Sequence, residues 1–403
     1  MLDAVLRKGQ TLDGAASFAR DLSPPDRALA LAIAGETLRR LPDLDTLVDG
    51  ATRQRLPDDS KARMALRLAL AQAIGLGTPA HAVVATALPL VDGGPRRLVH
   101  GVLGTLLRRG LPQSGAPRLP EQVEQRWRQS WGDSVVEAAR RQIAKRPALD
   151  LTFVDAAAAA AFASANDGRS LAQRQVRVQS ASVTELPGFG EGGWWVQDLA
   201  ASLPARLIPS DASEVLDLCA APGGKTMQLA AAGHRVTAVD ASGNRLRRLR
   251  ENLDRTHLDA ELVTADALSW RPDGQFDAIL LDAPCSATGT FRRHPEVLYR
   301  ARPAIIASSA ELQATLLARA AAWLKPGGSL VYAVCSLEAQ EGEEIVTAFL
   351  ANERKFKIEA PAPGEFPEFL QPAEQGWVRI LPGLLEEQGG LDGFFIARLV
   401  RTG

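Results

Sequence analysis

The sequence predicts an α/β protein whose N-terminal part is entirely helical, and three observations support this prediction. From Glu214 onward, apolar strand patterns alternate with helix patterns, which is typical of a parallel β-sheet. Residues 15–109 show helix patterns and no strand signal. A loop of small residues follows the first strand of the alternating part, as it does in nucleotide-binding α/β domains. We therefore expect a Rossmann-like domain behind a helical bundle.

Length and composition are those of a soluble protein with several domains. The 403 residues suffice for two or three domains, which we place at 1–115, 116–200 and 201–403. The chain is 46% hydrophobic, shows no secretory signal at its start, and has no apolar run near the roughly 18 residues that cross a membrane. Its three cysteines, Cys219, Cys285 and Cys335, are too few for a disulfide framework and match no zinc-site spacing. We expect a reduced, cytoplasmic, monomeric protein without a metal or a membrane partner.

The helical part begins with a clear start signal. Ser23 and Pro24 mark the first long helix, because serine caps a helix end and proline fits its first turn. Helix patterns follow over 28–38, 61–76, 81–91 and 96–109, and together they predict a small bundle. Leu111–Pro120, with its proline, glycine and serine residues, is the predicted linker.

Residues 121–200 predict a further helix and a small α+β insert. A helical stretch over 121–146 carries Trp127 and Trp131 on one face, where we expect them to pack rather than to stack on bases. Short strands around 149–154 and 174–178 flank an alanine-rich helix over 156–165, and the loop from Leu186 leads into another short strand before Asp198.

The alternating part predicts the main domain. Strands are expected over 214–218, 235–239, 260–264, 276–281 and 329–334, and helices over 225–232, 242–254, 304–324 and 341–350. Two late strands, around 378–381 and 394–399, are expected to finish the sheet at one edge.

Positive charge is concentrated in the N-terminal part, although the whole chain has a net charge of −1. Residues 1–146 contain 22 Lys and Arg against 15 Asp and Glu, whereas residues 147–403 contain 24 against 32. This asymmetry favours an N-terminal part that binds a polyanion such as nucleic acid. A solvated helical surface rich in arginine is the alternative.

The stretch Asp217-Leu-Cys-Ala-Ala-Pro-Gly-Gly-Lys-Thr226 is the predicted ligand cradle. Gly223 and Gly224 let the backbone approach a ligand closely, and the following helix start directs free N–H groups toward it. The spacing fits neither a Walker loop, which needs glycine where Cys219 stands, nor the dinucleotide fingerprint Gly-x-Gly-x-x-Gly. Asp240 closes the next strand, a position suited to binding ribose hydroxyls. A glycine-rich turn without a ligand is the alternative.

Two cysteines follow predicted strands. Asp282-Ala-Pro-Cys-Ser-Ala-Thr-Gly289 comes after the fourth strand, and Cys335-Ser336 comes after the fifth. Ligands of open α/β sheets bind beyond the carboxyl ends of the strands, so Cys285 and Cys335 are candidate functional residues. A small core residue is the usual alternative for a single cysteine.

These motifs, with Arg293-His-Pro295 and Asp392-Gly-Phe-Phe-Ile-Ala397, resemble those of the RNA cytosine-5 methyltransferases. The helical front, with Leu22-Ser-Pro-Pro-Asp-Arg27, is similar to the NusB-like RNA-binding module of the bacterial 16S rRNA members, the RsmB/Sun group. The resemblance covers nearly the whole chain. It implies an all-α NusB-like domain, a small α+β insert and a Rossmann-like methyltransferase domain that uses S-adenosylmethionine.

The resemblance also implies residue roles. Cys335 would attack carbon 6 of a cytosine and Cys285 would assist release of the methylated base, whereas the Pro-Cys nucleophile of DNA cytosine-5 methyltransferases would make Cys285 the attacker. Asp282 would hydrogen-bond the cytosine ring, and Lys225 would keep a thiolate ionised or polarise the base carbonyl. The implied cofactor residues are Cys219, Ala220, Ala221, Pro222, Gly223, Gly224, Lys225, Asp240 at the ribose, Arg245, Asp266 near the adenine, and Asp282.

The implied substrate is 16S rRNA in a loop or single-stranded region, because the target base must leave its stack. The rival functions are the same chemistry on tRNA or another rRNA site, and a non-catalytic RNA-binding assembly factor. Val334 stands where the family usually has threonine, a change to a supporting contact rather than to the chemistry. Leu149-Asp-Leu-Thr-Phe153 replaces an Arg-Val-Asn-like stretch, so the family's RNA contact from the insert does not carry over to this sequence. Candidate phosphate contacts are Arg245, Arg247, Arg248, Arg250, Arg292 and Arg293, of which the first four also fit a solvated helix face.

Overall fold

The computed structural model describes residues 1–112, 115–179 and 182–402, and the chain divides into two compact units. The first unit comprises Met1–Arg146 together with Phe291–Arg300. The second comprises Pro147–Thr290 and Ala301–Gly403. The chain therefore leaves the second unit after Thr290 and returns to it at Ala301. The finer boundaries at 115/116 and 200/201 stay a prediction.

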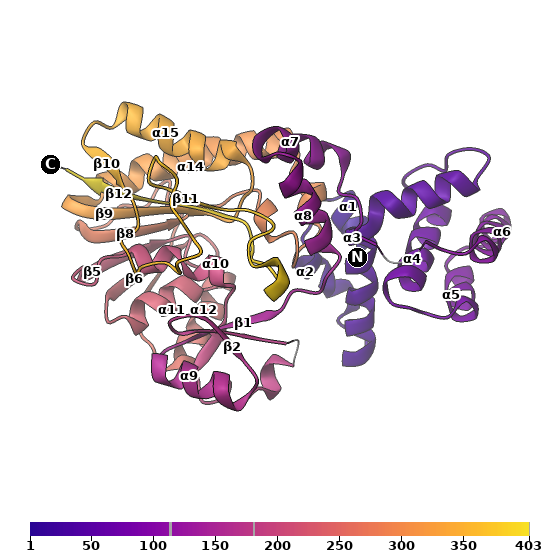
Figure 1. Cartoon of the computed structure of the whole chain (residues 1–403), viewed down its shortest axis with the longest axis horizontal. Coiled ribbons are helices and arrows are strands. Elements are labelled where there is room, and N and C mark those ends of the chain that lie inside the picture. Colours follow the sequence, from indigo (N-terminus) through magenta and orange to yellow (C-terminus); the bar gives the residue numbers. More distant parts are fainter. Residues whose placement is uncertain (113–114, 180–181, 403) are drawn as a thin grey trace. The chain divides into compact units, whose positions relative to one another are not determined.

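The first unit is built of helices, as predicted (indigo and purple in Figure 1). Ser23 caps the long helix α3 by accepting a hydrogen bond from the N–H of Asp26 (3.3 Å). This helix extends past the predicted range because Leu41, Leu44 and Val48 continue its buried face. The helices are α1 (Leu2–Leu6), α2 (Leu12–Ala15), α3 (Pro24–Ala51), α4 (Lys61–Gly75), α5 (Ala80–Ala87), α6 (Gly93–Arg109), α7 (Glu121–Trp131), α8 (Asp133–Ile143) and α13 (Val297–Arg300), with 3-10 turns η1 (Ala16–Ala19) and η2 (Leu88–Leu90).

The predicted single helix over 121–146 is two helices. Gly132 separates α7 from α8 and has a φ of 84°, which breaks the helical path and which residues other than glycine rarely adopt. Trp127 on α7 is fully buried, and this agrees with the packing role expected for it.

Paired charges lie between α3 and α4. The guanidinium of Arg63 is fully buried and donates to both carboxylate oxygens of Asp49 (2.6 and 3.0 Å). Arg67 donates in the same way to Asp45 (2.7 and 2.8 Å). A two-pronged pair of this kind offsets the charge of a buried guanidinium. These two arginines therefore serve the bundle itself and account for part of the basic residues counted in the N-terminal part.

Residues 291–300 belong to the first unit although they stand late in the sequence. The ring of Phe291 packs edge-on against Trp127, with 5.5 Å between ring centroids. The hydroxyl of Tyr299 donates to the carbonyl of Leu38 (2.7 Å), and the N–H of Leu12 donates to Glu296 (3.0 Å). The Arg293-His-Pro295 motif is thus held by the helical bundle.

The second unit opens with the small α+β insert. Its four-stranded sheet has the order β2-β3-β1-β4, and β1 pairs antiparallel with both β3 and β4. The strands are β1 (Leu149–Phe153), β2 (Arg169–Ala172), β3 (Gln175–Val178) and β4 (Trp194–Val196), with helix α9 (Ala156–Ala165) and the 3-10 turn η3 (Val183–Glu185). The expected strands and the alanine-rich helix are confirmed.

The main sheet has the order β10-β12-β9-β8-β5-β6-β7, and β11 also pairs with β12. The five neighbouring strands β9, β8, β5, β6 and β7 are parallel to one another. Strand β12 runs antiparallel to β9, and β10 runs antiparallel to β12. The strands are β5 (Glu214–Leu218), β6 (Arg235–Asp240), β7 (Glu261–Thr264), β8 (Phe276–Asp282), β9 (Leu324–Val334), β10 (Phe356–Glu359), β11 (Val378–Ile380) and β12 (Phe394–Arg401).

All the predicted strands of this sheet exist, and the two late ones lie at one edge of it as predicted. There β11 pairs with the first part of β12, whereas its second part pairs with β10, a strand that was not predicted. Four residues, Phe-Lys-Ile-Glu, give too short an alternation to stand out. They pair because β12 offers a free antiparallel side.

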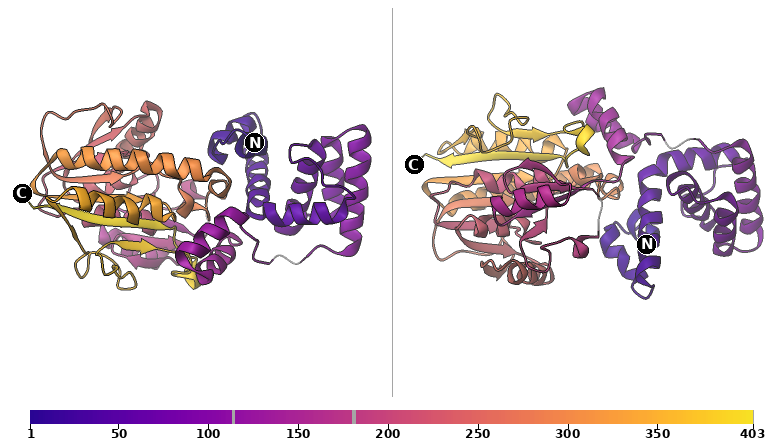
Figure 2. Two further views of the ribbon diagram at one scale, coloured as in Figure 1. Left: turned by 90° about the horizontal axis from the view of Figure 1, so that it is seen from above. Right: turned by 60° about the horizontal axis from the view of Figure 1, so that its bottom comes forward.

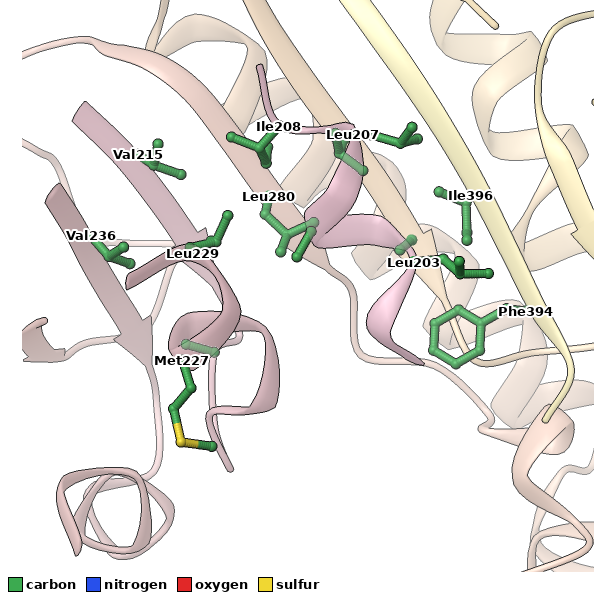
Figure 3. Close-up of a cluster of buried hydrophobic side chains, with 14 of the residues drawn as sticks. Leu203, Leu207, Ile208, Val215, Met227, Leu229, Val236, Leu280, Phe394 and Ile396 are labelled. Atoms are coloured by element: carbon green, nitrogen blue, oxygen red, sulfur yellow. The ribbon is translucent and has the colours of Figure 1, made fainter. Parts of the chain in front are cut away.

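Helices cover both faces of the main sheet (Figures 1 and 2). On one face, apolar residues of α10, η4 and α11 pack on the strands; Figure 3 shows Leu203, Met227 and Leu229 with Val215 and Leu280. On the other face α14 and α15 pack against Ile279, Leu281 and Tyr332. The helical elements are α10 (Leu199–Ser202), η4 (Pro204–Leu207), α11 (Gly224–Ala231), α12 (Gly243–Thr256), η5 (Thr288–Thr290), α14 (Pro303–Ala322), η6 (Ala339–Glu341), α15 (Glu343–Asn352) and η7 (Glu386–Gln388).

Within the described ranges, no helix combines the length and the apolar character that a membrane span needs. The same residues contain no group of three or more His, Cys, Asp and Glu side chains that could hold a metal ion.

Candidate active site

The predicted ligand cradle is a tight loop between β5 and α11. Gly223 has a φ of 108°, and a Cβ atom there would lie 2.0 Å from the Cδ1 atom of Leu249. Only glycine fits both the conformation and the space. The loop is anchored to the neighbouring strand, since the N–H of Ala220 donates to the carbonyl of Val239 (3.1 Å). Helix α11 starts directly after it, so the first N–H groups of the helix face the loop.

Asp217 stands in β5 beside the loop and is fully buried. Burial is the largest influence and raises the pKa of its carboxyl to about 7, although the hydrogen bond from Thr226 Oγ1 (2.6 Å) lowers it. Its Oδ1 atom has no hydrogen-bond partner among the residues that the structure describes. A ligand that brings a donor or a positive charge to this place would satisfy that atom.

Asp240 ends β6 and is 4% exposed. Its Oδ2 atom accepts a hydrogen bond from the N–H of Ala221 (3.2 Å), and its Oδ1 atom accepts one from the N–H of Ser242 (2.9 Å). Arg245 Nη1 lies 3.3 Å from Oδ2, and the same guanidinium donates to the carbonyl of Ala221. The fold thus brings Arg245 and Asp240 together at the loop, as expected of two residues at one binding site.

Lys225 and Asp282 form an ion pair between the loop and the end of β8. The two side chains approach to 2.7 Å between Nζ and Oδ2, and Lys225 is 8% exposed. Burial alone would lower the pKa of Lys225, but the charge and hydrogen bond of Asp282, followed by the charges of Cys335 and Asp217, outweigh burial and raise it. The ammonium also lies 5.4 Å from the ring centroid of Phe394. Lys225 therefore carries a positive charge, and it interacts electrostatically with Cys335.

Cys285 and Cys335 meet at the carboxyl ends of β8 and β9. Their Sγ atoms lie 3.5 Å apart, and both residues are half-buried. The hydrogen bond with Cys335 is the largest influence on Cys285, followed by burial, and together they raise the pKa of the Cys285 thiol well above its usual range. The pKa of the third cysteine, Cys219, is raised to about 12, chiefly by burial. Cys219 is thus a neutral thiol in the loop after β5, apart from the pair formed by Cys285 and Cys335.

A buried carboxylate that the sequence analysis missed ties the two cysteine loops together. Glu341 is fully buried, and its carboxylate accepts hydrogen bonds from the Ser286 N–H (2.8 Å), the Ser286 hydroxyl and the Ser336 hydroxyl (2.5 Å). Gln313 Nε2 donates to the same carboxylate (3.2 Å). Ser286 and Ser336 each follow one of the two cysteines. Nothing periodic marks Glu341 in the sequence, and the only signal was an acid six residues after Cys335.

The Asp392-Gly-Phe-Phe motif completes the site from β12. The N–H of Gly393 donates to the carbonyl of Gly289 (2.9 Å), and the N–H of Gly289 donates to the carbonyl of Cys335 (3.0 Å). A Cβ atom at Gly289 would lie 2.0 Å from the Gly393 carbonyl oxygen. Three segments far apart in the sequence thus touch through their backbones, and this contact explains both glycines.

The structure brings most of the predicted site together. Asp266 follows Ala265, whose N–H donates to the carbonyl of Asp240 (3.2 Å), so Asp266 lies beside the end of β6; it is exposed and accepts a hydrogen bond from the N–H of Leu268 (2.9 Å). Arg292 is buried, with 1% exposure, and belongs with Arg293 to the first unit. The predicted residues at the loop or at the two cysteines are Cys219, Ala220, Ala221, Pro222, Gly223, Gly224, Lys225, Asp240, Arg245, Asp282, Cys285 and Cys335.

A basic cavity of about 390 Å³ lies within the first unit. Arg39 lines it and donates to the carbonyls of Ile143 (3.1 Å) and Arg292 (2.8 Å), so it joins α3 to α8 and to the 291–300 segment. The exposed side chains of Lys145 and Arg146 line the same cavity, as does Arg293. Of the six arginines predicted to contact phosphate, Arg293 alone lies here, whereas Arg247, Arg248 and Arg250 are exposed on α12 in the second unit.

Comparison with known proteins agrees with this architecture. Residues 204–400 match the model of the family described as 16S rRNA methyltransferase RsmB/F, and residues 1–108 match the NusB family. The ribosomal RNA small subunit methyltransferase B of Erwinia tasmaniensis is 33% identical, over 99% of this chain and 96% of its own length. Its namesake from Xylella fastidiosa is 37% identical, over 93% of this chain and 92% of its own. The crystal structure of PH0851 shares the fold, with a TM-score of 0.74 at 22% identity, over 96% of this chain and 93% of its own. The chain therefore belongs to the RsmB/F family of 16S rRNA methyltransferases and carries a NusB-family domain at its front.

Proposed function

We propose that this rRNA methyltransferase moves a methyl group from S-adenosylmethionine to carbon 5 of a cytosine in 16S rRNA, through a covalent bond between Cys335 and carbon 6 of that base. The observation that carries the proposal is the pair of sulfur atoms, those of Cys285 and Cys335, 3.5 Å apart near the buried Lys225 and its ion-pair partner Asp282. The names of the bacterial relatives specify the small-subunit rRNA, and this supports 16S rRNA as the proposed substrate. We also propose that the protein is a cytoplasmic monomer.

The side chains in and around the loop after β5 suit the chemical groups of S-adenosylmethionine. Asp240 is a strand-end carboxylate suited to two ribose hydroxyls, and Asp266 is exposed for a contact with the adenine. The unpaired Oδ1 atom of Asp217 suits the ammonium of the cofactor's amino-acid part. Residues 219–225 would surround that part, and Arg245 lies beside the carboxylate of Asp240. When bound, S-adenosylmethionine supplies an electrophilic methyl group.

Cys335 is the proposed nucleophile. Its attack on carbon 6 makes carbon 5 electron-rich, and carbon 5 can then accept the methyl group. The Lys225 ammonium interacts electrostatically with Cys335, next to the bond that the proposed attack forms. Asp282 lies at the end of β8, where it can hydrogen-bond the cytosine ring as charge develops.

Cys285 is proposed to act second, by removing the proton from carbon 5 so that the Cys335 sulfur can leave. Before attack, its hydrogen bond to Cys335 helps to raise the pKa of the Cys285 thiol, so it stays neutral. Once Cys335 is bonded to carbon 6, its sulfur can no longer carry a negative charge. The influence of Cys335 on the pKa of Cys285 is then removed, although burial still raises that pKa. We propose that Cys285 acts as the base at this later step.

The substrate is tested by offering unmodified 16S rRNA, 23S rRNA and tRNA with a labelled methyl donor. We expect label in 16S rRNA. Label only in tRNA or 23S rRNA would support the same chemistry on another substrate. Cofactor titration that shows binding, together with no label in any RNA, would favour an assembly factor without turnover.

A further inference from the structure

A second cavity, of about 340 Å³, lies within the second unit at the far end of helix α11 from the cofactor loop. It is lined by Phe153 at the end of β1, by the turn between β2 and β3, by η4, and by Ala231 in the last turn of α11. An eight-residue helix is about 12 Å long. The cavity is thus separate from the two cysteines, and nothing in the methyl-transfer chemistry uses it.

Two arginines reach this cavity from different elements. Arg174 sits in the turn between β2 and β3 with a φ of 61°, a conformation that non-glycine residues seldom adopt, and its Nη1 atom donates weakly to the carbonyl of Ala231 (3.4 Å). Arg206 on η4 donates through Nη2 to the carbonyl of Gln173 (2.8 Å). The Nε–H group of Arg206 is buried and has no acceptor among the described residues. Each guanidinium therefore keeps N–H donors for which the described residues provide no acceptor.

Among the described residues that line the cavity, Glu365 alone carries a carboxylate, and other donors engage it. That carboxylate accepts from Arg398 (2.6 Å) and from the N–H of Ala362 (2.5 Å). Burial, followed by the positive charge of Arg174, lowers the pKa of Arg206 to about 10. Two like charges held together in a partly desolvated place are unfavourable unless an anion joins them.

We propose that this cavity binds a phosphate group between the guanidiniums of Arg174 and Arg206. Forked guanidinium donors match phosphate oxygens, and both Arg174 and Arg206 line this cavity. The phosphate can come from the backbone of the substrate RNA or from free phosphate in solution. The RNA source rests on the proposed function, and it would give the α+β insert a role in RNA binding that its sequence did not imply.

The direct test uses inorganic phosphate and thermal unfolding of the full chain. Potassium phosphate, compared with potassium chloride at equal ionic strength, should raise the Tm of the wild-type protein. The R174Q/R206Q double variant should lose this rise, whereas Arg271→Gln should keep it, because Arg271 is an exposed arginine of the same unit that does not line the cavity. Arg206→Lys should show a reduced rise, since lysine keeps the charge but loses the fork. Unchanged S-adenosylmethionine affinity would confirm that the variants are folded.

The source is decided by RNA affinity at increasing salt. If the RNA backbone occupies the cavity, the slope of log K against log salt for a 16S rRNA transcript should be smaller by about 1 to 2 in R174Q/R206Q than in the wild type or Arg271→Gln. Phosphate-dependent Tm with an unchanged slope would indicate free phosphate. Loss of neither property would overturn the proposal. Both measurements are binding experiments, so a failure of the methyl-transfer function would not be mistaken for a failure of this site.

Discussion

The Sγ atoms of Cys285 and Cys335 lie 3.5 Å apart, although 50 residues separate them in the sequence. Each cysteine follows a strand, β8 or β9, and these strands are parallel neighbours in the sheet. Parallel strands that end at one edge deliver both thiols to one place. Because the two sulfurs are so close, both can reach the same base. Their proposed roles differ, so substitution of each cysteine alone tells these roles apart.

We expect the two cysteine variants to accumulate different species. Cys335→Ala should abolish both methylation and any covalent protein–RNA complex, because the nucleophile is missing. Cys285→Ala should still attack and transfer the methyl group, then stall with the RNA attached. Denaturing gels of each variant with 16S rRNA and cofactor would show this. A complex trapped by Cys335→Ala and absent from Cys285→Ala would reverse the assignment.

Glu341→Gln should lower methylation more than it lowers stability. The Glu341 carboxylate receives donors from both cysteine loops, so its loss loosens the spacing of the two sulfurs. Displacements of about 1 Å at reacting groups can cost on the order of 100-fold in kcat. Disruption of the buried hydrogen bonds should reduce the free energy of unfolding by about 1–3 kcal/mol.

The control for this variant is Glu344→Gln, which changes an exposed acid only three residues away. It should leave both kcat and the unfolding free energy at wild-type values. Equal activity of Glu341→Gln and Glu344→Gln would show that the shared carboxylate does not position the cysteines.

Asp240→Ala should weaken binding of S-adenosylmethionine and leave the fold intact. Asp240 is a buried strand-end carboxylate beside the loop, and loss of its charge-assisted hydrogen bonds should cost about 1.5–3 kcal/mol of binding free energy. Isothermal titration calorimetry measures the change. A folded variant that binds the cofactor as tightly as the wild type would refute the ribose role.

Asp217→Asn should change the pH dependence of stability. The pKa of Asp217 is raised to about 7 in the fold and is near 3.9 in an unfolded chain, so between these values the folded state holds a proton that the unfolded state has lost. This residue's contribution to stability is therefore fully present below about pH 4 and falls as the pH rises toward 7.

The advantage of Asp217→Asn over the wild type should accordingly grow between pH 5 and pH 8, by about 3 kcal/mol. Urea unfolding of both proteins without cofactor at these two pH values measures it. A difference in stability that does not change with pH would contradict the raised pKa.

Replacement of Lys145 and Arg146 by glutamine should weaken RNA binding and flatten its salt dependence. Both are exposed on the basic cavity of the first unit, where loss of a phosphate contact lowers the slope of log K against log salt by about 1 per residue. The test needs the full chain, since Phe291–Arg300 belongs to this unit. Arg108→Gln/Arg109→Gln removes two exposed charges of α6 that do not line the cavity, and it should leave the slope unchanged. Equal slopes for both double variants would show that Lys145 and Arg146 do not bind phosphate and that the excess of basic residues in the first unit is only a solvated surface.

Sequence patterns predicted the parts of this molecule that depend on local chemistry. Strand alternation located β5 to β9, and the small residues of 219–224 located the loop, because glycine and apolar periodicity act over a few neighbouring residues. Features set by the assembled sheet were not predictable in this way. Glu341 is defined by four donors from three other segments, and β10 exists because β12 offers it a side. The membership of Phe291–Arg300 in the helical unit was likewise invisible in the order of the chain.

The central claim is methyl transfer to carbon 5 of a cytosine through Cys335. It is tested most directly by incubating unmodified 16S rRNA with the protein and an isotope-labelled methyl donor, digesting the RNA to nucleosides, and identifying the labelled nucleoside by mass spectrometry. The account predicts labelled 5-methylcytidine with the wild-type protein and none with Cys335→Ala. A label on another atom or another base, or equal labelling by Cys335→Ala, would contradict it.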